Sequence, residues 1–240
     1  MRVSSTPADP GKNRLVAALA PDEFERISPA FQAVSFELGD VVYEFGGHLD
    51  YVYFPTTAIV SLLYTMENGA TAEMGLTGND GVVGIALFMG GDTMPNRAVV
   101  QSAGNAVRMK AKVLQAEFAL GGQLQRLLLR YTQALITQIS QTAVCNRLHS
   151  VEQQLCRWLL LSHDRAPGDE LIMTQELIAD MLGVRREGVT VAAGRLQDIG
   201  AISYVRGRIQ ILDRTKLEDT ACECYQVVRD EFDRLLGSKV

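Results

Sequence analysis

The sequence feature that most constrains the fold is the run over 174–212 near the C-terminus. Thr174 can cap a short helix, and Gly183 then permits a sharp turn because glycine adopts a left-handed backbone at low cost. A second helix is predicted over about 185–199. After it, Arg206-Gly207-Arg208 separates two short apolar runs that are typical of paired strands. A helix, a tight turn, a second helix and a basic hairpin in this order predict a winged helix-turn-helix.

The side chains of this run are suited to reading DNA. Arg186 and Glu187 stand at the start of the second helix, where such helices contact base edges. Arginine can donate two hydrogen bonds to guanine, and glutamate can accept one from cytosine. We therefore predict base contacts from Arg186, Glu187 and Thr190. Contacts to the DNA backbone are predicted from Thr174, Gln175, Arg185, Arg206 and Arg208.

The charge distribution agrees with a confined DNA-binding module. The chain has 240 residues and a net charge of −5, which argues against a protein that coats nucleic acid over its whole surface. Residues 174–216 carry 7 basic and 5 acidic side chains, whereas 1–173 carry 13 and 17 and 217–240 carry 3 and 6. The single positive block thus coincides with the predicted helix-turn-helix.

The N-terminal half has the pattern of an antiparallel β domain. Short runs rich in Val, Ile, Phe and Tyr alternate with glycine turns between about residues 31 and 112. Asn68-Gly69 between two apolar runs indicates a hairpin. Strands at this spacing predict a sandwich or barrel. A polar arm and short helices, one starting at Pro21, precede it.

Helical spacing replaces the strand pattern from about residue 113. One apolar stripe follows steps of three and four, and it consists of Leu124, Leu128, Tyr131, Leu135 and Ile139. Two partners could cover this stripe: the chain's own domain, or the same helix of a second subunit. We predict the second, and hence a homodimer. A further helix is predicted over 214–236, after the wing.

The stretch from Thr174 to Val189 resembles the helix-turn-helix of the Crp/Fnr family, the cyclic-AMP receptor protein and the fumarate-nitrate regulator. The resemblance implies an α+β chain with an antiparallel, cyclic-nucleotide-binding-like β-roll. Family members usually carry a further arginine where Thr190 and Val191 stand here, and often a serine in place of Arg185. The implied division is an arm and short helix (1–21), a β-roll sensor (22–112), a dimerisation helix (113–147), a winged helix-turn-helix (148–213) and a C-terminal helix (214–240).

The resemblance also indicates where an effector would bind. The family's pocket matches Gly84, Ile85, Arg97 and Ala98, where Arg97 could meet an anion. Ile85 cannot accept a hydrogen bond from a ribose hydroxyl, so cyclic AMP is not expected. An iron–sulfur cluster is not expected either, because the first cysteine is Cys145 and the family's cluster uses N-terminal cysteines. A haem sensor on His48 and a redox sensor on Cys222 stay open, and the effector is unknown.

Several classes of function are not expected. The cysteines form no C-x-x-C pair and the three histidines are far apart in the sequence, so no metal site is predicted. No enzyme motif is found. No apolar run is long enough to cross a membrane, and the cytoplasm is the expected compartment.

The sequence predicts a transcription regulator that binds an inverted repeat in double-stranded DNA as a homodimer. The resemblance leaves RNA polymerase open as a further partner. The alternative is a small-molecule, redox or haem sensing module whose DNA-binding domain is non-consensus or vestigial. The operator and the sign of regulation stay open.

Overall fold

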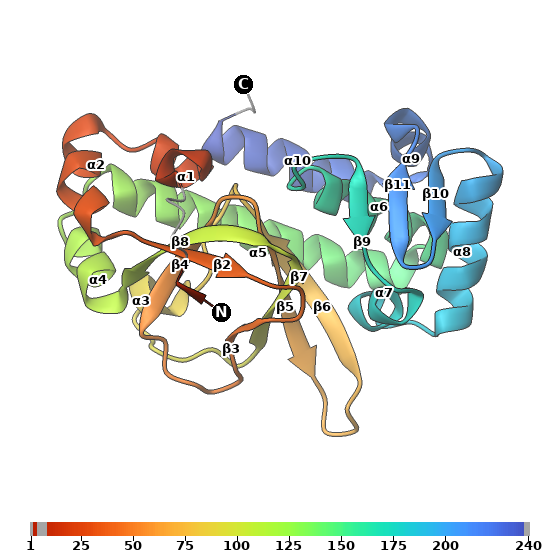
Figure 1. The fold of residues 1–240 in the computed structure, drawn as a ribbon, viewed down its shortest axis with the longest axis horizontal. Helices are drawn as coiled ribbons and strands as arrows, with labels where there is room; N and C mark the ends of the chain where they lie inside the picture. Colours follow the sequence, from red (N-terminus) through yellow and green to blue (C-terminus); the bar gives the residue numbers. More distant parts are fainter. Residues whose placement is uncertain (1, 4–8, 238–240) are drawn as a thin grey trace.

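The computed structural model describes residues 2–3 and 9–237. Two β-sheets and the N-terminal helices form one end of the molecule, a small helical domain with a β-hairpin forms the other, and a long helix runs beside both (Figure 1). The α+β fold class predicted from the sequence is confirmed. Part of the predicted arm, residues 1 and 4–8, lies outside the described residues. No described helix combines the length and apolarity needed to cross a membrane.

The β-rich end consists of two four-stranded antiparallel sheets. The first has the order β1 (Arg2–Val3), β2 (Gln32–Phe36), β8 (Gly104–Lys110), β4 (Tyr51–Pro55). The second has the order β3 (Val41–Tyr43), β7 (Arg97–Ser102), β5 (Ile59–Thr65), β6 (Thr71–Thr77). The turn between β5 and β6 contains Asn68 and Gly69, and Gly69 has a φ of +83°. The predicted hairpin is thus confirmed, with glycine where the backbone is left-handed.

Short helices pack around these sheets. They are η1 (Pro10–Lys12), α1 (Arg14–Ala17), α2 (Pro21–Ile27), η2 (Ser28–Ala30) and α3 (Ala86–Met89). The predicted helix start at Pro21 is confirmed. Asn13 caps α1, since its side-chain oxygen accepts from the backbone N–H groups of Leu15 and Val16.

The helix predicted as one element over 113–147 is two helices. They are α4 (Ala111–Ala119) and α5 (Gln123–Leu148), separated at Gly121-Gly122, where Gly121 has a φ of +75°. The Glu23 carboxylate of α2 accepts from the backbone N–H groups of Gln123 (2.6 Å) and Leu124 (2.8 Å). A negative charge at a helix N-terminus is favourable, which gives α5 its own start point.

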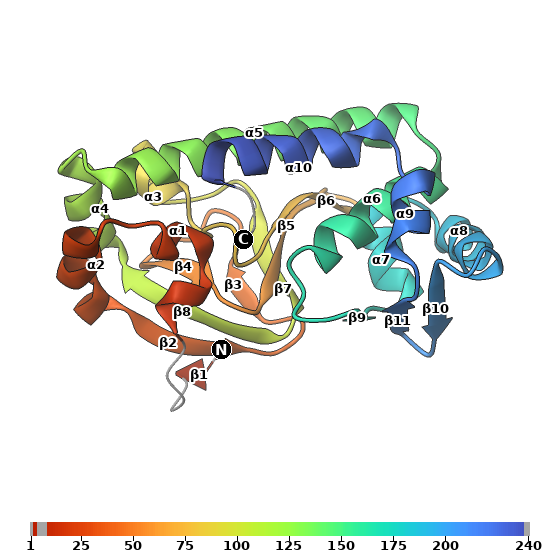
Figure 2. The ribbon, with the colours of Figure 1, turned by 90° about the horizontal axis from the view of Figure 1, so that it is seen from above.

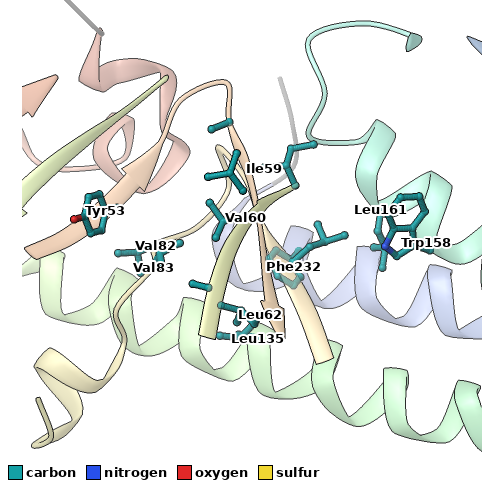
Figure 3. Close-up of a cluster of buried hydrophobic side chains, with 14 of the residues drawn as sticks. Tyr53, Ile59, Val60, Leu62, Val82, Val83, Leu135, Trp158, Leu161 and Phe232 are labelled. Atoms are coloured by element: carbon teal, nitrogen blue, oxygen red, sulfur yellow. The ribbon is translucent and has the colours of Figure 1, made fainter. Parts of the chain in front are cut away.

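The predicted dimer stripe on α5 faces the interior of its own chain, so that prediction is wrong. Leu124, Leu128, Tyr131 and Leu135 are at most 3% exposed, and Ile139 is half-buried. The Tyr131 hydroxyl lies 2.8 Å from the Thr77 hydroxyl of β6, and Figure 3 shows Leu135 beside Leu62 of β5. The stripe was correctly predicted to be apolar and buried. Its partner is the second sheet, because periodicity specifies a buried face but not what covers it.

The C-terminal end is helical with a small antiparallel sheet of order β10-β11-β9. Its elements are α6 (Val151–His163), β9 (Glu170–Ile172), α7 (Gln175–Leu182), α8 (Arg186–Asp198), β10 (Ile202–Val205) and β11 (Arg208–Ile211). The helix predicted over 214–236 is in fact α9 (Arg214–Thr220) and α10 (Glu223–Leu236). The chain is extended at Ala221 and Cys222, and this break lets α10 run back along α5 (Figure 2).

The two ends share a continuous apolar core that includes Trp158 and Leu161 of α6 and Phe232 of α10 (Figure 3). A buried ion pair also joins them. Arg165, just after α6, contacts Asp80 of the loop after β6 through Nη2–Oδ2 (2.6 Å) and Nε–Oδ1 (3.0 Å), and neither side chain is more than 6% exposed. The Arg165 guanidinium also lies over the Phe232 ring, so this pair connects β6, α6 and α10.

The stability of the fold is expected to depend on pH through the carboxyl of Glu73, which is buried between β6 and α6. Burial raises the pKa of Glu73 to about 7 from an ordinary value of 4.5. A folded-state pKa above the unfolded one favours folding below pH 4.5, and this contribution is lost as pH rises toward 7. We expect the contribution of Glu73 to the free energy of unfolding to fall by about 3 kcal/mol over that window. Urea unfolding across the window should show a flatter dependence for Glu73→Gln, and equal slopes would contradict the assignment.

Candidate nucleic-acid interface

The predicted helix-turn-helix is formed by α7 and α8. The Thr174 hydroxyl accepts from the backbone N–H of Leu177 (3.2 Å) and caps α7. Gly183 ends α7 in the left-handed conformation, with φ 65° and ψ 34°. Val189, Ala192 and Leu196 of α8 are buried, at most 3% exposed. These buried residues fix which face of α8 points outward.

The outward face of α8 carries the side chains predicted to read bases. Arg185, Arg186, Glu187 and Thr190 are all exposed. The Thr190 hydroxyl lies 2.8 Å from Gln175 Oε1 and 3.1 Å from the Arg186 carbonyl oxygen. Thr190 thus holds α7 and α8 together while it remains at the surface. This contact fixes the exposed N-terminal turns of α7 and α8 relative to each other.

The wing is a tight hairpin of β10 and β11 with a two-residue turn. Arg206 (φ 50°) and Gly207 (φ 80°) both have positive φ, as a type I′ turn requires. Arg206 is exposed at this tip. Arg208 lies in β11, and its Nη1 is 2.8 Å from Glu170 Oε1 of β9. The Arg206 side chain is therefore exposed to solvent at the wing tip, whereas Arg208 already pairs with the carboxylate of Glu170.

Four of the eight predicted DNA contacts, Thr174, Gln175, Arg186 and Arg206, line one small cavity. A cavity of about 250 Å³ is lined by Thr174, Gln175, Arg186, Tyr204, Arg206 and Gly207. Two guanidinium groups and no carboxylate line it, so this place is positively charged, as a surface that binds DNA requires. In the described part of the chain no carboxylate pairs with Arg186 or Arg206, in contrast to Arg195, which pairs with Glu152.

Tyr204 is a member of this cavity that the sequence interpretation missed. Its hydroxyl donates to the carbonyl oxygen of Met173 (2.7 Å), and its backbone N–H donates to Gln197 Oε1 (2.9 Å). These bonds connect the wing to the start of α7 and to α8. An aromatic residue in a wing strand next to the basic turn was the sequence sign that could have identified it.

The four residues predicted for an effector pocket have different surroundings in the described structure. Arg97 lines a cavity of about 200 Å³, and its Nη2 is 3.1 Å from Glu44 Oε1. Gly84 has a φ of +108° and lies near the backbone of Tyr51. Ala98 is buried, and Ile85 immediately precedes α3. An anion at Arg97 would have to compete with Glu44.

The two candidate sensor residues have different surroundings. The His48 side chain is 77% exposed, and its Nδ1 lies 3.1 Å from Asp92 Oδ2. The Cys222 side chain is buried, at only 6% exposed. It stands in a group with Cys145, His149 and Cys224. The spacing of these residues predicted no metal site, but the fold brings Cys145 and His149 together with Cys222 and Cys224, which are distant from them in sequence, at the end of α5.

Comparisons with known proteins agree with this geometry. Residues 153–220 match the family model described as the Crp-like helix-turn-helix domain. FixK2 from Bradyrhizobium japonicum is 18% identical, with 80% of this chain and 98% of that chain covered and a TM-score of 0.66. CLP from Xanthomonas campestris, described as c-di-GMP responsive, is 16% identical, with 80% and 99% covered and a TM-score of 0.63.

A third solved structure, a mutant of CooA from Carboxydothermus hydrogenoformans, is 14% identical, with 91% of this chain and 97% of that chain covered and a TM-score of 0.61. No curated protein sequence matches the chain. Residues 153–220 thus match a Crp-like helix-turn-helix, and the fold is similar to that of these three solved structures. The chain carries a Crp-like helix-turn-helix domain within the Crp/Fnr fold, which confirms the resemblance seen in the sequence.

Proposed function

We propose that this protein is a sequence-specific transcription regulator, not an enzyme, that binds an inverted-repeat operator as a homodimer in the cytoplasm. The observation that carries the proposal is the cavity at which α7, α8 and the wing meet, lined by Arg186 and Arg206 without a carboxylate. The β-rich end is the proposed sensor for an effector other than cyclic AMP. A vestigial DNA-binding domain would not account for two arginines at this place that pair with no carboxylate among the described residues.

The proposed roles follow from position. Arg186 and Glu187 stand at the exposed start of α8 and are proposed to read bases, with Thr190 supporting them. Thr174, Gln175, Arg185 and Arg206 are proposed to contact phosphates. Arg208 is a weaker candidate than it was from sequence, because DNA would first have to draw it away from Glu170.

A second copy is proposed to bind along the face of α5 that this chain leaves uncovered. Leu129 is 50% exposed and Ile136 is 56% exposed, and Ala143 continues the same exposed line at an interval of seven. A spacing of seven brings side chains to one seam between two helices that coil around each other. This seam replaces the stripe predicted from the sequence. Dimers of this kind place two recognition helices about one DNA turn apart.

Binding measurements on variants test the proposed DNA contacts. The probe is an operator recovered by genome-wide mapping of bound DNA, together with its single-base variants, at several salt concentrations. Arg186→Ala or Glu187→Ala should cost roughly 1–3 kcal/mol of binding free energy and relax preference at one base pair per half-site. Arg206→Ala should weaken all sequences alike and reduce the salt slope by about one unit.

Arg195→Ala is the matched control, because Arg195 lies on α8 but is paired with Glu152 of α6. It should leave affinity and base preference nearly unchanged. A change of base preference in Arg206→Ala, with uniform weakening in Arg186→Ala, would reverse the two roles. Failure of the wild type to bind any duplex specifically would favour the vestigial-domain alternative.

A further inference from the structure

Four side chains that commonly ligate metals meet where α5 ends and α10 begins. Cys145 and His149 are four residues apart near the C-terminus of α5, so both lie on one face of the helix. Cys222 immediately precedes α10, and Cys224 stands in its first turn. The three cysteines are at most 6% exposed. The pair Cys145 and His149 and the pair Cys222 and Cys224 are far apart in sequence but lie together in the folded chain.

The distances among the four ligand atoms fit a single tetrahedral ion. All four atoms lie within 4.8 Å of one another. Cys145 Sγ is 3.5 Å from Cys222 Sγ, and Cys224 Sγ is 3.5 Å from His149 Nδ1. Around tetrahedral zinc, the usual bond lengths place two sulfurs about 3.8 Å apart and a sulfur and a nitrogen about 3.6 Å apart. The Cys145–Cys222 and Cys224–His149 distances are within a few tenths of an ångström of these values, and no pair of the four atoms exceeds them by more than about 1.2 Å.

We propose that Cys145, His149, Cys222 and Cys224 form a zinc site that joins the end of α5 to the start of α10. Three thiolates and one imidazole are a ligand set of structural zinc sites, which are closed and four-coordinate. The four atoms are too close together to enclose several irons with bridging sulfides. Soft sulfur ligands also disfavour magnesium and calcium, which take oxygen.

The surroundings of the histidine support the same assignment. His149 Nδ1 faces Cys224, while its Nε2 lies 3.5 Å from Glu223 Oε2. Histidines that bind a metal through one ring nitrogen usually donate from the other to a carboxylate or carbonyl, which fixes the ring and its tautomer. Glu223, between the two cysteines of α10, is therefore assigned as the residue that orients His149.

The net negative charge of such a zinc site would lie near a buried cationic side chain, Arg157. Zinc with three thiolates and a neutral imidazole carries one net negative charge, whose burial requires a compensating group. Arg157 of α6 is 3% exposed, acts electrostatically on Cys145, and has an Nε without a hydrogen-bond partner among the described residues. Its Nη1 donates to Thr142 of α5 (3.0 Å). A cation is thus present on the α6 side of the cluster.

The position of the site gives it a structural role that does not depend on the proposed DNA contacts. Residue 150 begins the helical domain directly after α5, and α10 follows the last helix of that domain. The zinc would therefore connect the points where the chain enters and leaves this domain. Metal content and DNA affinity are separate readouts, so either proposal can fail alone.

Metal analysis of the purified full-length chain is the direct test. The wild type and Cys156→Ser should each retain about one zinc per chain after dialysis, whereas Cys222→Ser should lose it. Cys156 is the matched control because it is buried in α6 but is not part of the group. Chelator should lower the melting temperature of the wild type and of Cys156→Ser, and should leave that of Cys222→Ser unchanged.

Cobalt provides a test that does not depend on whether a variant folds. Wild-type chain stripped of metal and supplied with Co²⁺ should develop thiolate charge-transfer bands and the visible bands of a tetrahedral ion, and zinc should abolish both. Wild-type protein that binds neither metal would overturn the proposal. So would iron with acid-labile sulfide in protein purified without oxygen, or a Cys145–Cys222 disulfide that forms whether or not zinc is supplied.

Discussion

Asp80→Ala is expected to lower the free energy of unfolding by about 3–5 kcal/mol, because it leaves the buried Arg165 guanidinium without its counter-ion. Water cannot replace the lost carboxylate easily, since the Arg165 side chain is only 3% exposed. Trp158, the single tryptophan, is buried in α6 close to this junction and can report the transition by fluorescence during urea unfolding.

Asp92→Ala is the control for this change. It removes a carboxylate whose partner His48 is largely exposed, and the expected loss is below about 1 kcal/mol. Replacing Asp80 and Arg165 together by leucine and methionine should restore much of the loss, because two apolar side chains leave no buried charge behind. An Asp80→Ala loss no larger than that of Asp92→Ala would show that the ion pair is not important for stability.

Leu129→Glu combined with Ile136→Glu is expected to convert the dimer into a monomer at micromolar concentration. Four like charges would face one another across the proposed seam on α5. DNA affinity should fall by roughly 100-fold or more, because the second half-site no longer binds as part of the same complex. Sedimentation and operator binding measure the two effects.

Arg130→Glu is the matched control, since it adds negative charge on the same helix but away from the line of Leu129 and Ile136. It should leave the dimer intact. Leu128→Glu, in contrast, would place a charge in the core of a single chain and should unfold it rather than separate the subunits. A double variant that still sediments as a dimer would place the interface elsewhere.

The parts of the structure that the sequence predicted are those specified by neighbouring residues. The cap at Thr174, the left-handed turn at Gly183 and the hairpin around Gly207 each depend on a few adjacent residues, and the structure contains all three, with Arg208 in β11 rather than in the turn. For the same reason the predicted DNA contacts Thr174, Gln175, Arg186 and Arg206 could be found at one cavity.

What the sequence did not predict depends on residues that are distant along the chain. The pair Gly121-Gly122 is a local sign of the break after α4, but nothing near Gln123 indicates that Glu23 caps α5. The stripe of Leu128 and Leu135 specifies a buried face, but only the folded sheet decides that β5 and β6 cover it. The cluster of Cys145, His149, Cys222 and Cys224 was not predicted for the same reason, since its two pairs are more than seventy residues apart in the sequence.

The return of α10 to α5 determines how the helical domain can move. The chain enters this domain at the end of α5 and leaves it beside the same point, where Cys145 and Cys222 are 3.5 Å apart (Figure 2). A body whose two chain connections coincide can swivel about that pivot without stretching either one. Its angle is then set by noncovalent contacts alone, among them Asp80 with Arg165 and α7 with β6. Loosening these contacts would change the separation of the two recognition helices in a dimer while each domain stays folded.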